Sequence, residues 1–133
     1  MRSPRPRAGI SPKRRLSAVP RDTAAQLAER SAGWCEIQLP ECMGRAVHPH
    51  HRITTKSGGR HGAAKVDHDR LSDLLHLCFL CHDVVTNRPA RAQTYGWSLL
   101  EGQEPTRESL LYRGVPSYLD DVGGVWSLEE VGA

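Results

Sequence analysis

Cys78-Phe79-Leu80-Cys81-His82 is the stretch of sequence that decides the fold. Two residues separate its cysteines, a spacing that lets both thiolates reach one tetrahedral ion at about 2.3 Å. A looser pair, Cys35 and Cys42, lies upstream with six residues between the two thiols. Four cysteines in two pairs predict a structural zinc site, in which no coordination position stays open for catalysis.

The composition of the chain favours such a metal staple. Its 133 residues fit one domain with tails, but only 38% are hydrophobic and 5% aromatic. A chain so poor in large apolar residues often needs a metal or disulfides to be stable. No apolar run reaches the roughly 18 residues of a membrane span, and no apolar stretch follows the basic N-terminus as in a secretory signal. We therefore expect a cytoplasmic protein whose cysteines hold metal, and we disfavour two disulfides in a secreted domain.

Charge divides the chain into three regions. Residues 1–21 carry seven basic and no acidic residues, residues 22–97 nine basic and eight acidic, and residues 98–133 two basic and seven acidic. The four prolines of the first region disfavour a helix there. This arm is either a nucleic-acid contact, acting through phosphate charge, or a solubilising tail, and its composition does not separate the two.

Local patterns predict short elements around the cysteines. Asp22 sits near the N-cap of an expected helix that Gly33 ends. Pro49 confines the strand around it to an edge or a bulge. The expected elements are helices at 22–30, 82–87 and 90–95, a strand at 46–53, a loop at 57–69, a short helix or tight turn at 71–77, and β-type segments at 97–100, 110–112, 118–119 and 125–126.

All seven histidines fall between positions 48 and 82. We expect chance surface placement for His48, His61, His68 and His76, whereas three others belong to a motif. That motif comprises Trp34-Cys35-Glu36, His50-His51-Arg52-Ile53, Gly58-Gly59, Leu71-Ser72-Asp73-Leu74-Leu75, Cys78-x2-Cys81-His82 and Pro89. Its order and spacing resemble the HNH endonucleases, and more closely the zinc-bearing HNH proteins of phages and prophages, over residues 30–97.

The resemblance implies an α+β fold. Its centre would be a small ββα-metal (His-Me) finger at residues 22–97, stapled by the zinc site of four cysteines. Charge and local pattern, rather than the resemblance, predict a flexible basic arm at 1–21 and an extended acidic tail at 98–133 that wraps around the domain or partly pairs. By the same resemblance, His51 is the general base, and His50 and His82 hold a catalytic divalent ion (Mg²⁺, Mn²⁺, Ni²⁺ or Zn²⁺).

Two positions depart from the family pattern. The Asn that braces the site is replaced by Asp73, which accepts hydrogen bonds but donates none when ionised. Thr86 stands where many relatives have a further histidine, one helical turn after His82. Thr86, Asn87 or water would then complete the ion's ligands.

The implied function is metal-dependent hydrolysis of DNA phosphodiester bonds, by nicking or double-strand cleavage. The expected phosphate contacts near the site are Arg52, Lys56, Arg60 and Lys65. The resemblance also implies a terminase partner in phage genome packaging and, for a phage-encoded chain, location in the host cytoplasm. The alternative is a zinc-stabilised module that binds DNA or protein with little or no activity, which Asp73 and Thr86 favour.

Overall fold

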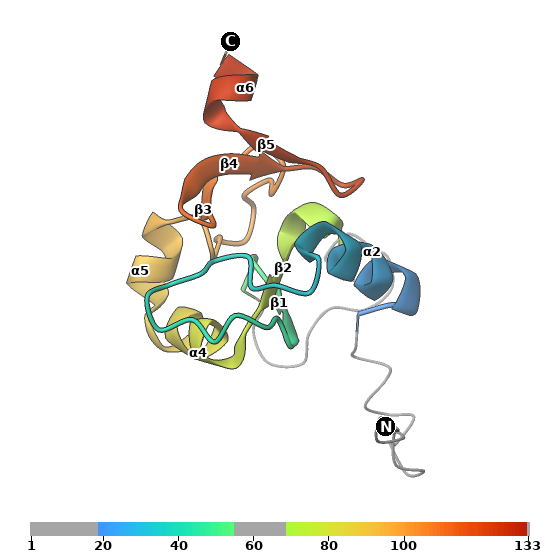
Figure 1. Cartoon of the computed structure of the whole chain (residues 1–133). Coiled ribbons are helices and arrows are strands. Elements are labelled where there is room, and N and C mark those ends of the chain that lie inside the picture. The colour runs from blue at the N-terminus through green and yellow to red at the C-terminus, as the bar shows by residue number, and fades with distance from the viewer. Residues whose placement is uncertain (1–18, 55–68, 133) are drawn as a thin grey trace.

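The computed structural model describes residues 19–54 and 69–132, which combine helices with two small antiparallel sheets (Figure 1). Most of the basic arm and of the expected loop at 57–69 lie outside these residues. In chain order the elements are α2 (Arg21–Ser31), β1 (His48–His51), the 3-10 helix η1 (Leu71–Asp73), β2 (Leu74–Leu77), α4 (Phe79–Asn87), α5 (Pro89–Thr94), β3 (Leu110–Tyr112), β4 (Val115–Leu119), β5 (Val125–Ser127) and α6 (Leu128–Gly132). None of the helices in this described part is long and apolar enough to cross a membrane.

A β-hairpin followed by a helix forms the centre of the fold. Strands β1 and β2 pair antiparallel, with His48 opposite Leu77 and His51 opposite Leu74. Helix α4 begins at Phe79, earlier than the expected residue 82, because the Cys78 side chain caps its first turn. The helix ends at Asn87, just before Pro89, as predicted. Strands from distant parts of the chain thus lie side by side and lead directly into one helix.

Helix α2 matches the expected position but not the expected cap. Pro20 occupies the N-cap position without a side-chain hydrogen bond, and Asp22 lies in the first turn. There its negative charge favours the helix through the dipole rather than through capping. At the other end Ala32 adopts the left-handed conformation with φ of 56° and precedes Gly33, the expected stop.

The segment after residue 97 was expected to be an extended tail that wraps or partly pairs, and it pairs into a sheet that packs on the core. Strands β3, β4 and β5 form an antiparallel sheet in that order, which confirms the expected strands at 110–112, 118–119 and 125–126. The expected segment at 97–100 forms no strand and makes only an isolated bridge between Leu99 and Ile53. Leu110, Tyr112 and Leu119 belong to the same buried cluster as the cysteines. Gly96 permits this packing, because a Cβ at that position would clash with the Ser109 carbonyl oxygen. Residues 98–132 are therefore an integral part of the packed structure.

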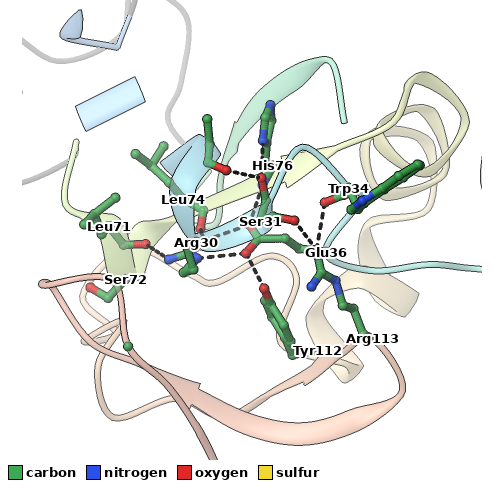
Figure 2. A network of polar contacts seen from close by, with 12 residues as sticks. Arg30, Ser31, Trp34, Glu36, Leu71, Ser72, Leu74, His76, Tyr112 and Arg113 are labelled. Carbon is green, nitrogen blue, oxygen red and sulfur yellow. Dashed lines mark hydrogen bonds and ion pairs between the residues drawn. The ribbon is translucent and has the colours of Figure 1, made fainter. Parts of the chain in front are cut away.

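A buried polar network joins α2, the segment after it, β2 and β3 (Figure 2). Arg30 donates to both carboxylate oxygens of Glu36 at 2.8 Å, and these side chains are 2% and 0% exposed. Arg30 also donates to Leu74 O, while Glu36 accepts from His76 N and from the Tyr112 hydroxyl. Because the pair is hydrogen-bonded on every side, its burial is compensated.

Candidate metal centre and histidine pocket

The four cysteines gather into one cluster. Their sulfur atoms lie within 4.8 Å of one another, and all four thiols are free. The Sγ atoms of Cys42 and Cys78 are 3.7 Å apart, far beyond a disulfide bond of about 2.05 Å. Four sulfurs bound tetrahedrally at about 2.3 Å from one ion would be separated by about 3.8 Å. The cluster could therefore hold a metal ion such as zinc.

Backbone N–H groups point at two of these sulfurs. Cys78 Sγ accepts from Cys81 N at 3.3 Å and from Met43 N at 3.4 Å, and Cys42 Sγ accepts from Gly44 N at 3.3 Å. Burial raises the pKa of the Cys78 thiol, but hydrogen bonds from Cys81 N and Met43 N, with those of the Cys81 and Cys42 thiols, outweigh burial and lower it to about 7. Such donors orient and stabilise thiolate ligands around a metal.

The cluster also lies in the hydrophobic core. Cys35, Cys78 and Cys81 are fully buried among apolar side chains that include Leu77 and Val85. An ion held there would join the segment after α2 to the hairpin and to the start of α4. This is the stapling role that the sequence predicts for a chain with few large apolar residues.

Strand β1 with the residues that follow it, α4 and α5 line a pocket of about 320 Å³. Its lining includes His50 and His51 from β1, His82 and Thr86 from α4, and Gln93 from α5. The structure thus brings together the three histidines that the sequence singled out. Thr86, which stands where the HNH motif often has a further histidine, lines the same pocket.

His50 and His82 are suited to hold an ion as neutral imidazoles. Their ring centroids lie 5.4 Å apart. Burial lowers the pKa of His50 to about 4, although a 3.0 Å hydrogen bond with Trp97 O opposes this shift. Burial, followed by the nearby His48, also lowers the pKa of His82. A neutral ring nitrogen has the lone pair that a metal needs.

His48 was expected to be a chance surface histidine, and it is exposed. Its ring centroid nevertheless lies 5.2 Å from that of His82. It shares a strand face with His50, since residues two apart on a strand point the same way. His48 therefore borders the pocket histidines without lining the pocket.

His51 faces a carboxylate that the sequence analysis missed. Its Nε2 lies 2.8 Å from Asp69 Oδ1, and Asp69 is 5% exposed. Asp69 is eighteen residues further along the chain. The only sequence signal was its place just before the Leu71-Ser72-Asp73 motif, and pairing of β1 with β2 brings it to the site.

Asp73 is fully buried and holds the chain that follows His51. Its Oδ1 accepts from Ile53 N at 2.8 Å, and its backbone oxygen accepts from Arg52 N at 2.7 Å. The carboxylate thus braces a neighbouring N–H as an acceptor, which is the only role open to an ionised aspartate.

The prediction that Arg52 contacts DNA phosphate is wrong. It is fully buried and donates to four backbone oxygens, so it is not available to a phosphate. The sequence could not show this, because an arginine beside a site looks the same whether it is exposed or buried. The other three expected contacts, Lys56, Arg60 and Lys65, lie outside the described residues.

Comparisons of the chain with protein-family models, with curated proteins and with solved structures find no match.

Proposed function

We propose that the protein is a metal-dependent endonuclease of the HNH type that hydrolyses phosphodiester bonds of DNA. One observation carries the proposal: β1 of an antiparallel hairpin and the helix after that hairpin contribute His50, His51 and His82 to the lining of a single pocket. In this proposal β1, β2 and α4 are the ββα-metal finger, and the four-cysteine cluster holds a structural zinc ion that keeps the finger folded.

His51 acts as the general base. It accepts a proton from water while the water oxygen forms a bond to phosphorus and the bond to the leaving oxygen breaks. A neutral imidazole can do this near pH 7. The pocket volume leaves room for a phosphate group and a water molecule beside the ring.

His50 and His82 hold the catalytic divalent ion. When bound, the ion would supply neutralisation of the charge that develops on the phosphate and the leaving oxygen. Two imidazoles favour a transition metal such as Mn²⁺, Ni²⁺ or Zn²⁺, while the small number of protein ligands also suits hydrated Mg²⁺. The Thr86 hydroxyl is within the same pocket lining and is the candidate for a further, weak oxygen ligand.

DNA is the proposed partner, and the resemblance to phage HNH proteins adds terminase subunits as a second. The competing function is a zinc-stabilised binding module without catalysis. Thr86 favours it, because a threonine lines the pocket where a stronger nitrogen ligand would stand. The two functions share the cysteine cluster and differ only at the pocket.

A plasmid assay separates them. Zinc-loaded protein is incubated with supercoiled DNA and Mg²⁺, Mn²⁺, Ni²⁺ or Zn²⁺, beside His51→Ala and the control Gln26→Ala, an exposed residue of α2 that does not line the pocket. We expect nicking or linearisation by wild type and Gln26→Ala, and a loss of about 10²-fold or more in His51→Ala. Equal cleavage by wild type and His51→Ala would reject His51 as the base. DNA binding without cleavage in any ion would favour the binding module.

A further inference from the structure

We infer that Asp69 is a positioning residue that sets the tautomer and orientation of His51, and that the C-terminal region holds Asp69 in place. The inference rests on the proposed function for its catalytic consequence. Its structural part, the state of the His51 ring, can be measured without any activity.

The hydrogen bond between the two residues has one direction. An ionised carboxylate only accepts, so His51 Nε2 carries the hydrogen that points at Asp69 Oδ1, 2.8 Å away. In a neutral ring the lone pair is then on Nδ1, since only one nitrogen is protonated. Asp69 therefore selects the tautomer in which Nδ1 carries the lone pair.

Burial makes this hydrogen bond strong and specific. The Asp69 side chain is 4% exposed and that of His51 is 25% exposed. The carboxylate is therefore shielded from water, while the imidazole borders the pocket. A hydrogen bond to an ionised acceptor that is shielded from water is stronger than the same bond at the surface, so it holds the ring in one orientation.

The C-terminal region anchors the chain next to Asp69. Arg70 donates to Glu104 at 2.6 Å and to Asp121 at 2.8 Å, so both acidic partners come from residues after 97. Asp121 also accepts from the Ser72 hydroxyl and from Ser72 N. These contacts fix the backbone on the C-terminal side of Asp69. Glu104 and Asp121 of the acidic region thus bind the residue next to Asp69.

The test compares Asp69→Asn with Asp83→Asn, which removes an exposed carboxylate from α4. In Asp69→Asn the side-chain amide can turn its NH₂ toward His51, which favours the tautomer with hydrogen on Nδ1. Long-range ¹H–¹⁵N NMR of histidine-labelled protein at neutral pH reads the tautomer directly. We expect the Nε2–H form in wild type and Asp83→Asn, and a shift away from it in Asp69→Asn.

Plasmid cleavage is measured in parallel. With the base in the wrong tautomer, we expect kcat to fall about 10²-fold in Asp69→Asn, with KM, zinc content and melting unchanged. An unchanged His51 tautomer in Asp69→Asn overturns the inference, whether kcat falls or not. If the tautomer shifts but wild type cleaves no DNA, Asp69 is upheld as the residue that positions His51, and the proposed function fails instead.

Discussion

Replacing Arg52 by lysine distinguishes a buried anchor from a DNA contact. Arg52 Nε donates to Gly96 O at 2.9 Å, Nη1 to Ser72 O at 2.9 Å and Pro105 O at 3.0 Å, and Nη2 to Glu108 O at 2.9 Å. These four acceptors come from three separate segments of the chain. A planar guanidinium with five donors can serve all of them, whereas a lysine ammonium has three donors at one point.

The expected loss of folding free energy follows from the carbonyl oxygens that a lysine would leave without a hydrogen-bond donor. Burial lowers the pKa of Arg52 to about 10, against the attraction of Asp73, so the group is still charged at neutral pH. Each buried carbonyl that loses its donor costs about 1–3 kcal/mol, and we expect two such losses. A total near 3 kcal/mol is a large part of the roughly 5–15 kcal/mol that stabilises a domain. For a chain of this size it corresponds to a fall in Tm of about 10 °C.

Thermal and urea unfolding of zinc-loaded protein measure this change. The control is Arg91→Lys at an exposed position on α5, where we expect a change within about 0.5 kcal/mol. DNA affinity per folded molecule is measured by fluorescence anisotropy and should be unaffected in Arg52→Lys. Unfolding like wild type together with weaker DNA binding would refute the reasoning, because it would mean that Arg52 is an accessible phosphate contact.

Two further predictions concern the metal cluster and pH. Removal of the metal from the four-cysteine cluster by a strong chelator should abolish native circular dichroism and cooperative melting. The reason is that the ion would join core segments that few large apolar residues hold together. Native melting after verified metal loss would contradict this prediction. Hydrogen bonds from Arg70 lower the pKa of Glu104 to about 2. The stabilisation of the fold by ionised Glu104 should therefore be complete above pH 4.5, the ordinary pKa of a glutamate, and should disappear as the pH falls toward 2. Glu104→Gln should have a lower Tm than wild type at about pH 6 and a smaller difference near pH 2.5, in matched melting curves. A constant difference would show that the carboxylate charge is not involved.

Much of the local structure follows from neighbouring residues. The x2 spacing of Cys78 and Cys81 predicts a shared ligand site because it depends on one turn of chain. The helix around residues 22–30, the end of α4 before Pro89 and the short strands of the C-terminal region follow from similar local rules. The grouping of His50, His51 and His82 came from a motif rather than from periodicity, and the structure brings these side chains to one pocket.

Other features depend on contacts between distant parts of the chain. The partner of His51 is Asp69, and nothing in the spacing of the two residues indicates it. The ion pair between Arg30 and Glu36 could have been read as surface charge, yet Tyr112, 76 positions after Glu36, completes its hydrogen bonds. Such side chains have the same identity in water and in a core, so the sequence does not reveal which of them is buried.

The sequence by itself therefore predicted the four-cysteine cluster, the histidine set and most of the short elements, because each is encoded within a few residues or within a recurring motif. It predicted a short helix or tight turn where β2 forms, and it did not predict α6. Only the tertiary structure decided that Arg52 is an internal anchor and that residues 98–132 complete the core. Both outcomes arise from burial, which depends on how the whole chain packs rather than on the character of any single residue.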